Sequence, residues 1–409
     1  MSTELPRAAR ELPTLAVAAA LALAAAVSLG LARFSYALLL PPMRTDLGWS
    51  YLTAGAMNTV NAAGYLAGAL LAPGWLRRYG ARNALLAGGA ASALLLAAHG
   101  AVTSDAALYL LRGLTGIASA ATFISGGLLA ARLSGRAPRA GEAPGRAPSA
   151  GLVLGLYYGG TGIGIVISAL LVPPLSALSG AHAWQWAWIA LGAAAGVATW
   201  ITAQATRTLD PSRTAPAAGA RLAWSPFACG LVSYFLFGLG YIGYMTFVVT
   251  LLREQRLSSV AITVFYALLG LAVLASSWIW AGLLQRHRGG GAMRLLNALL
   301  ALATVLPVLS AHPVAVFASG LLFGAVFLSV VASTTALVRH NLPPAAWPAG
   351  IAAFTIVFAA GQIVGPTLVG WVADGAGGLR GGLACSAGVL LLGALIAWGQ
   401  KPLAGAAPR

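Results

Sequence analysis

Residues 13–40 read PTLAVAAALALAAAVSLGLARFSYALLL and carry a single charged side chain, Arg33. An apolar run of about 20 residues is long enough to cross a hydrocarbon core of roughly 30 Å as a helix. The apolar core of a signal peptide has only about 7–15 residues. Arg7 and Arg10 followed by this longer run therefore indicate an uncleaved first membrane helix.

Eleven further apolar runs of similar length follow, separated by clusters of Arg, Pro and Gly. The chain is 59% hydrophobic and 8% charged, whereas about a quarter of the residues of a typical soluble domain are charged. We therefore predict an all-α integral membrane protein. Its twelve spans are predicted at residues 13–40, 50–76, 83–102, 106–132, 151–173, 183–205, 223–252, 258–284, 293–311, 313–338, 348–372 and 381–399.

The net charge of +16 follows the predicted topology. Basic residues near span ends mark the cytoplasmic side of a membrane protein. With the N-terminus inside, the basic residues on the outer side are only Arg44, Arg253, Arg256 and Arg380. We expect a multi-pass protein of the cell inner membrane with both termini in the cytoplasm. The excess charge then faces the anionic inner leaflet, and nucleic acid is not expected as a partner.

Two polar segments, residues 133–149 and 207–222, lack a hydrophobic period and are predicted to be linkers. The second separates a predicted bundle of six helices at residues 1–206 from another at residues 223–409, as in a protein built from a repeat. The sequence carries no nucleophile with a base, no metal-ligand spacing and no phosphate-binding loop. Neither an enzyme nor a bound cofactor or metal is therefore expected.

The loop after the second span of each half is short, basic and glycine-bearing: GWLRRYGAR at residues 74–82 and GLLQRHRGGG at residues 282–291. Both loops resemble the motif G-x-L-a-D-r-x-G-r-r of the major facilitator superfamily. The gating residues that this resemblance implies are Gly74, Arg77, Arg78, Gly80 and Arg82 in the first copy and Gly282, Arg286 and Gly289 in the second. In the superfamily the aspartate helps to latch the cytoplasmic gate. Arg77 and Arg286 stand at that position here, so this chain departs from the family's latch.

Further stretches carry the same resemblance. RGLTGIASA at residues 112–120 is similar to the motif R-x-x-q-G-x-g-a-a of the fourth helix, and GLYYGGTGIG at residues 155–164 resembles the glycine motif of the fifth without its proline. Residues 30–50 and 61–72 look like the YbfB/YjiJ group of bacterial permeases. The resemblance implies twelve transmembrane helices in two pseudo-symmetric six-helix bundles, the MFS fold, and transport by alternating access.

Two arginines, Arg33 and Arg112, lie within predicted spans. A charged side chain near the centre of a span costs about 2.5–3.5 kcal/mol on insertion scales, so each requires an explanation. One explanation is that both snorkel to the outer membrane surface. The other is that both face a central water-filled cavity, which in this superfamily is lined by helices one, four, seven and ten. A guanidinium matches a carboxylate in geometry, so the second explanation predicts an anionic substrate.

All eight acidic residues fall in tails, in loops or at span ends, so no span centre carries a carboxylate. Proton-driven exporters of the superfamily commonly use such a buried acid. A coupled proton would here travel with an anionic substrate or through His99 at the outer end of the third span. A single histidine at a helix end is more typical of an interfacial residue.

Polar side chains at helical spacing complete the predicted substrate site. They are Asn58, Asn61 and Tyr65 on one face of the second span, Thr115 beside Arg112 on the fourth, Tyr241 and Tyr244 on the seventh, and Gln362 on the eleventh. Hydrogen bonding between helices is the alternative role for each polar residue. Trp184, Trp186 and Trp188, at the outer end of the sixth span, are predicted to form an interfacial belt.

Together these features predict a secondary active transporter that carries a small organic anion. The alternative is an efflux transporter of amphipathic drugs in the same superfamily, which would use the aromatic face of the seventh span. We expect a monomer whose partners are the small-molecule substrate, the lipid bilayer and, where coupling exists, a co-transported proton.

Overall fold

The computed structural model describes residues 12–134, 149–209, 224–343 and 346–403. Within these ranges the chain is helical and contains no β-strand. The predicted linkers at residues 133–149 and 207–222 lie almost entirely outside the described residues, so the linkers and the domain boundaries drawn from them remain predictions.

The helices fall into two sets, which we call the N-terminal half and the C-terminal half. The N-terminal half contains α1 (Thr14–Ala25), the π-helix η1 (Ala26–Phe34), α2 (Tyr36–Leu47), α3 (Tyr51–Tyr79), α4 (Ala81–His99), α5 (Asp105–Ser134), α6 (Ala150–Ser176) and α7 (Trp184–Ala205). The C-terminal half contains η2 (Ser225–Phe227), α8 (Ala228–Glu254), α9 (Ser259–Ile279), α10 (Ala281–Arg286), α11 (Gly291–Leu309), α12 (Pro313–Asn341), α13 (Trp347–Ala373) and α14 (Gly378–Ala397).

Each of the twelve predicted spans corresponds to one helix or one continuous helical segment, so the predicted fold class is confirmed. α1, η1 and α2 form a single span, Thr14–Leu47, and α9 continues into α10. Eleven of these segments are long and apolar enough to cross a membrane. The twelfth, α3, has the length but is more polar, partly because it carries the buried residues Asn58 and Asn61.

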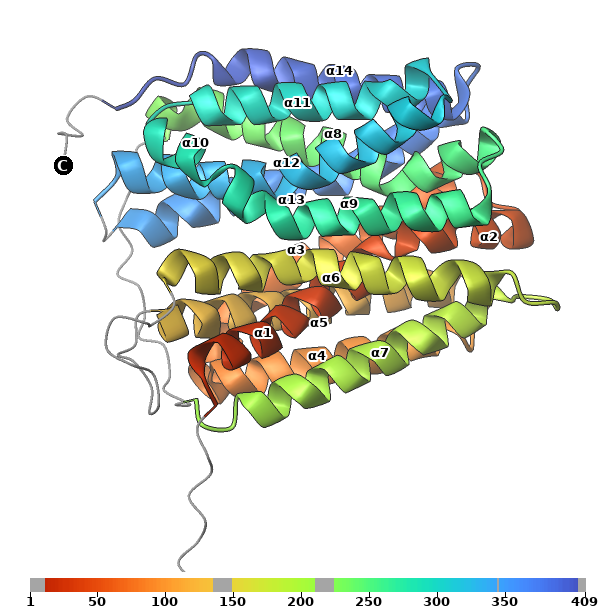
Figure 1. Ribbon diagram of the computed structural model, residues 1–409, viewed down its shortest axis with the longest axis horizontal. Helices are drawn as coiled ribbons and strands as arrows, with labels where there is room; N and C mark the ends of the chain where they lie inside the picture. The colour runs from red at the N-terminus through yellow and green to blue at the C-terminus, as the bar shows by residue number, and fades with distance from the viewer. Residues whose placement is uncertain (1–11, 135–148, 210–223, 344–345, 404–409) are drawn as a thin grey trace, which may run out of the picture.

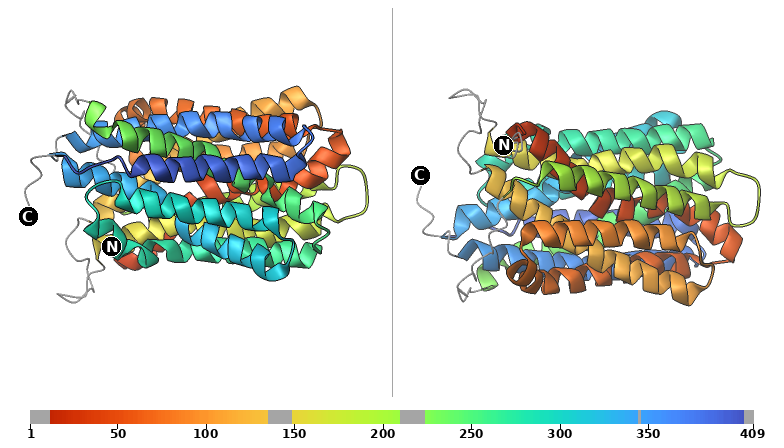
Figure 2. Two further views of the ribbon diagram at one scale, coloured as in Figure 1. Left: turned by 90° about the horizontal axis from the view of Figure 1, so that it is seen from above. Right: turned by 90° about the horizontal axis from the view of Figure 1, so that it is seen from below.

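The two halves lie side by side (Figure 1), with α6 running along α9 where they meet. A second seam joins α3 to α13. In both views of Figure 2, α1 begins and α14 ends at the same end of the bundle, which we call the termini end. The other end, where α2 turns into α3 and α6 is followed by α7, we call the opposite end.

Glycines allow α6 to pack closely on both sides. A Cβ atom on Gly164 would lie 2.8 Å from the Cα atom of Gly30 in η1. A Cβ atom on Gly162 would lie 2.2 Å from the carbonyl oxygen of Gly270 in α9. Small residues of this kind let helix backbones approach in lipid. α6 is therefore packed backbone to backbone against the first span of its own half and against the other half.

The two copies of the basic loop have different contacts. Gly80, between α3 and α4, has a φ of 78°, which glycine adopts more easily than other residues. Arg82 donates hydrogen bonds to the carbonyls of Ala203 (3.0 Å) and Thr206 (3.1 Å), so it caps the end of α7. In the second copy the N–H of Gly290 donates to the carbonyl of Gln400 (2.8 Å), which fixes the segment after α14.

The remaining residues of the predicted loop motif make fewer contacts. Arg77 and Arg78 are exposed in the last turn of α3, and Arg286 is exposed in the last turn of α10. A side chain added at Gly74 or Gly282 would meet nothing within 4 Å. The gating role of these residues stays a prediction.

Candidate substrate site between the two halves

The first span changes helix type at its centre. α1 passes into the π-helix η1 at Ala26, and at its end the N–H of Ser35 donates to the carbonyl of Gly30, five residues earlier (3.0 Å). π-helical segments are rare and frequently lie at functional sites. Arg33 is the last residue but one of η1. The irregular segment of the span therefore carries Arg33, the one charged residue of the span that does not lie at its end.

Arg33 is buried, and within the described residues no carboxylate pairs with its charge. Only 3% of the residue is exposed, so it does not snorkel to the membrane surface. Its Nε and Nη2 atoms have no hydrogen-bond partner among the described residues, and no carboxylate there forms a salt bridge with it. A buried donor without an acceptor costs about 1–3 kcal/mol, and more when it is charged. The guanidinium therefore has buried donors that remain unsatisfied within the described part of the chain.

Two side chains from other helices lie near Arg33, and a third side chain is bonded to one of them. Its Cζ atom lies 5.7 Å from the ring centroid of Tyr65 on α3. The phenol of Tyr241 on α8 is close enough to interact electrostatically with it, and the amide nitrogen of Gln362 on α13 donates to that phenol. The structure thus brings four predicted site residues together from both halves: Arg33, Tyr65, Tyr241 and Gln362.

Nearly parallel aromatic rings extend from Tyr241. Its ring stacks with those of Phe237, Phe358 and Phe327, at centroid distances of 4.8, 5.6 and 5.9 Å and interplanar angles of 18°, 16° and 10°. We call these four residues the aromatic wall. The three phenylalanines were not predicted as site residues, although the spacing of Tyr234, Phe237 and Tyr241 on one helix was a signal for part of the wall.

Tyr158 of α6 is a further residue that the sequence did not single out. It is 41% exposed, yet its phenol lies close enough to that of Tyr65 to interact electrostatically, and its ring packs 5.9 Å from that of Phe123. Gly160, two residues further along α6, packs against the backbone of Ala22, whereas Arg33 lies beyond Ala26, so Tyr158 lies on the termini side of Arg33.

Arg112 on α5 differs from Arg33 because the protein itself binds its guanidinium. Nη1 donates to the carbonyl of Ala32 (3.0 Å) and Nη2 to Oδ1 of Asn58 (3.2 Å). The group also lies over the ring of Tyr36, 4.8 Å from the centroid, and the residue is 1% exposed. Ala32 precedes Arg33 in η1, so Arg112 fixes the backbone that presents the unpaired arginine.

The two asparagines of α3 form hydrogen bonds between helices. Nδ2 of Asn61 donates to the carbonyl of Arg112 (3.0 Å). Nδ2 of Asn58 donates to Oγ1 of Thr246 on α8 (2.7 Å), while its Oδ1 accepts from Arg112. Asn58 therefore connects Arg112 to the C-terminal half.

Two other predicted site residues lie in packed surroundings. Thr115 is fully buried, and its Oγ1 has no partner among the described residues. Tyr244 forms a hydrogen bond with Oγ of Ser319 (2.7 Å) and stacks on Phe323 at 4.0 Å, so the contacts recorded for its side chain are to α12.

The interfacial roles predicted for the tryptophans and for His99 are largely wrong. Trp186 is 59% exposed, but Trp184 and Trp188 are buried at 1% and 0%. Trp188 stacks on the ring of His99 at 4.3 Å, and His99 is also 0% exposed. The physical reason is that α7 packs against α4 and α2, so two of its three tryptophans face the protein.

Replacing Arg112 by leucine should lower the Tm of the purified protein by several degrees. The change would leave the carbonyl of Ala32 and Oδ1 of Asn58 buried without a donor, at a cost of about 1–3 kcal/mol each. Thermal unfolding followed by intrinsic fluorescence would measure the effect. Arg78→Leu, at an exposed position on α3, is the control and should leave Tm unchanged. An unaltered Tm for Arg112→Leu would contradict this structural role.

The two halves are bonded to each other near the opposite end. Asp374, which follows α13, accepts hydrogen bonds from the N–H groups of Tyr51 (2.8 Å) and Leu52 (2.9 Å), the first residues of α3. The hydroxyl of Tyr51 donates to Glu254 at the end of α8. The other bonds between the halves join Asn58 to Thr246, Thr59 to Ile363 and Thr367, and Tyr266 to Phe34. All of these bonds between described residues lie between the level of Arg33 and the opposite end, which is therefore closed.

Comparison with known proteins agrees with this architecture. The family model that matches residues 25–398 is described as uncharacterised MFS-type transporter YbfB. A bacterial homologue of the human lysosomal transporter Spinster, solved in an inward-facing and unoccupied conformation, is similar with a TM-score of 0.71 at 14% identity, over 94% of this chain and 96% of that one. The nucleoside transporter NupG is similar with a TM-score of 0.66 at 15% identity, over 94% and 98%. None of the curated proteins matches the sequence.

Proposed function

The chain belongs to the YbfB family of MFS-type transporters, and we propose that it carries a small organic anion across the inner membrane. Family and fold make it a multi-pass secondary transporter and not an enzyme. In transporters built from two such bundles, one half rocks against the other around a site near the membrane centre. Arg33, Tyr65, Tyr241 and Gln362 would form that site.

The unpaired guanidinium of Arg33 is the observation that carries the proposal. Buried charges in proteins are normally paired, because an isolated one is costly. In the described part of the chain, every carboxylate lies at the opposite end, and none reaches Arg33. An anion bound from outside the chain would pair with Arg33 and so remove the cost of the isolated buried charge. A carboxylate suits best, since its two oxygens can accept from two N–H groups of one guanidinium.

The aromatic wall supports an anion with a flat apolar body. Aromatic pairs contribute about 0.5–1.5 kcal/mol beyond the area they bury, so a planar substrate would gain from stacking on Phe358, the one residue of the wall that is not fully buried. An uncharged or cationic drug could use the same rings but would leave Arg33 unpaired. This is why the structure favours an anion over an amphipathic drug.

Two features support an inward-open conformation. The distribution of basic residues predicts that the termini end faces the cytoplasm, and the hydrogen bonds between the described residues of the two halves lie between the level of Arg33 and the opposite end. The Spinster homologue was solved facing inward and unoccupied. In this orientation the substrate would reach Arg33 from the cytoplasm past Tyr158 and would be released outside after the opposite end opens, or move in the reverse direction.

A thermal-shift screen of the purified protein against small metabolites tests the substrate class. We expect the compounds that raise Tm to be organic anions, with planar carboxylates giving the largest shifts, because binding to the native state stabilises it by mass action. The shifts should become much smaller in Arg33→Gln. A set of hits dominated by cations, or shifts as large in Arg33→Gln as in the wild type, would overturn the proposal.

A further inference from the structure

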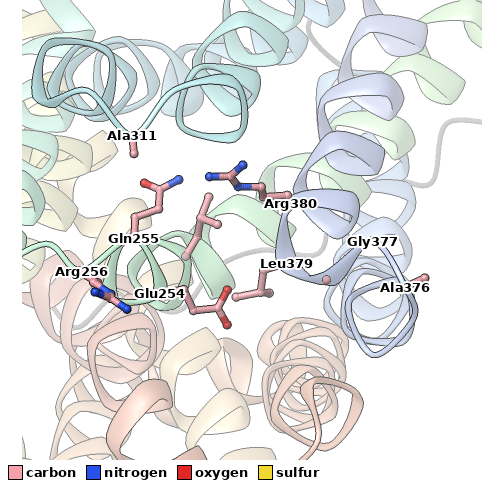
Figure 3. A pocket seen from close by; sticks show the side chains of 10 residues that line it. Glu254, Gln255, Arg256, Ala311, Ala376, Gly377, Leu379 and Arg380 are labelled. Atoms are coloured by element: carbon pink, nitrogen blue, oxygen red, sulfur yellow. The ribbon is translucent and has the colours of Figure 1, made fainter.

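The four arginines at the opposite end gather around two neighbouring hollows. Arg256 and Arg380 line a hollow of about 580 Å³ between the end of α8 and the start of α14 (Figure 3). Arg44 and Arg253 line a hollow of about 540 Å³ between α2 and α8. Glu254 lines both. The four basic residues that the sequence predicts on the outer side are therefore concentrated in one place.

The carboxylates at this end are occupied by donors other than arginine. Asp46 accepts from Trp184 and interacts with His182, Asp105 accepts from Trp49, Glu254 accepts from Tyr51, and Asp374 accepts from the backbone of α3. Within the described residues no carboxylate forms a salt bridge with any of the four arginines. Although the two signs are equal in number at this end, none of these four arginines is paired with a described carboxylate, and Arg44 instead lies over the ring of Tyr51, 3.7 Å from the centroid.

Arg256 and Arg380 both occupy positions that local structure disfavours for them. Arg256 follows α8 with a φ of 62°, in the left-handed conformation that usually requires glycine at a helix end. Arg380 lies in the first turn of α14, where the helix dipole disfavours a positive charge. Backbone strain of the kind seen at Arg256 clusters at active sites and ligand-binding sites. In Figure 3 Arg256 and Gln255 lie on one side of the hollow and Arg380 reaches toward it from α14.

We propose that the hollow lined by Arg256 and Arg380 binds a small carboxylate at the opposite end of the transporter. Two guanidinium groups supply charge-assisted donors, and the uncapped start of α14 at Gly377 adds the positive end of a helix dipole. The carboxylate of Glu254 partly offsets this charge, so the site suits a monoanion held weakly. Such a site would raise the local concentration of anions at the opposite end of the transporter. It is separate from the site at Arg33 and does not depend on it.

Fluorine NMR can detect binding at this hollow directly. The full-length protein, with Cys229 and Cys385 replaced by serine, would carry a trifluoromethyl tag at Ala376→Cys, which lines the hollow. Sodium benzoate would be titrated at constant ionic strength against sodium chloride. We expect a saturable shift of the fluorine signal whose Kd rises about tenfold or more in the double variant Arg256→Gln/Arg380→Gln.

Two controls separate this site from others. Arg33→Gln should retain the saturable shift, which distinguishes this proposal from the central site, and Arg78→Gln at the termini end should also retain it. Tetraethylammonium chloride should give no saturable shift. A response that rises linearly with benzoate, equals that of the double variant or disappears in Arg33→Gln would overturn the proposal.

Discussion

Arg33→Leu is expected to abolish anion transport and, at the same time, to raise the Tm of the empty protein. Transport should fall at least about 100-fold, because two charge-assisted hydrogen bonds of about 1.5–3 kcal/mol each would be lost to the substrate. Stability should rise because the unfilled site holds a buried guanidinium with two unpartnered nitrogens. Transport and stability therefore change in opposite directions. This is expected where a group needed for substrate binding lowers the stability of the substrate-free protein.

Arg112→Leu provides a matched control, because it removes the same side chain from another buried position in the same half. Its guanidinium is bound by Ala32 and Asn58, so the same substitution should lower Tm. Uptake into proteoliposomes of the anion that gives the largest thermal shift would measure transport for both variants. A lower Tm for Arg33→Leu would show that the protein itself satisfies Arg33, and near-normal transport would remove it from the site.

The spans could be predicted from the sequence because the length of an apolar run is set by the membrane. The largest error concerns the first span, which was predicted to end at residue 40 and continues to Leu47. Pro41 and Pro42 were interpreted as a break, yet both lie inside α2. Proline is tolerated within membrane helices because neighbouring groups can satisfy the freed backbone. The π-helix η1 had no recognisable signal either, since it depends on contacts with α5 and α6.

The difference between Arg33 and Arg112 could not be predicted from the sequence. Both are single arginines in apolar spans, and the distinction depends on whether a carbonyl and an amide from other helices reach the guanidinium. Ala32 and Asn58 are distant from Arg112 in the chain. The prediction that Trp184 and Trp188 lie at the membrane interface failed for the same reason. Helical spacing predicts on which face of a helix a residue lies, but it does not predict which neighbouring helix packs against that face.

Asp374→Ala is expected to open the opposite end of the transporter. The carboxylate of Asp374 accepts hydrogen bonds from the first two N–H groups of α3, and a negative charge there is also stabilised by the helix dipole. The seam is tight at this point, since a Cβ atom on Gly370 would lie 2.3 Å from the carbonyl oxygen of Tyr51. Because these hydrogen bonds are exposed to solvent, each is expected to stabilise the closed opposite end by about 0.5–1.5 kcal/mol. Their loss should shift the population toward an open opposite end about tenfold or more.

Pulsed electron paramagnetic resonance between spin labels at Thr45→Cys and Val260→Cys would measure this opening. Both positions are exposed at the opposite end, one in each half, and the native cysteines would be replaced. We expect a longer distance to become prominent in Asp374→Ala. Asp105→Ala is the control, because it removes a carboxylate at the same end whose bond to Trp49 lies within one half (2.8 Å). The distances in Asp105→Ala should not change.

Asp374→Asn separates the charge from the hydrogen bonds. The amide oxygen can accept one N–H of α3, but the charge and the second acceptor are lost, so its distance distribution should lie between those of the wild type and Asp374→Ala. Tyr51→Phe should have a smaller effect than Asp374→Ala, because it removes only the bond to Glu254. Unchanged distances in Asp374→Ala would mean that the glycine contacts of α3 with α13 and of α6 with α9 close this end by themselves. Asp374 would then be a cap of α3 and not part of the gate.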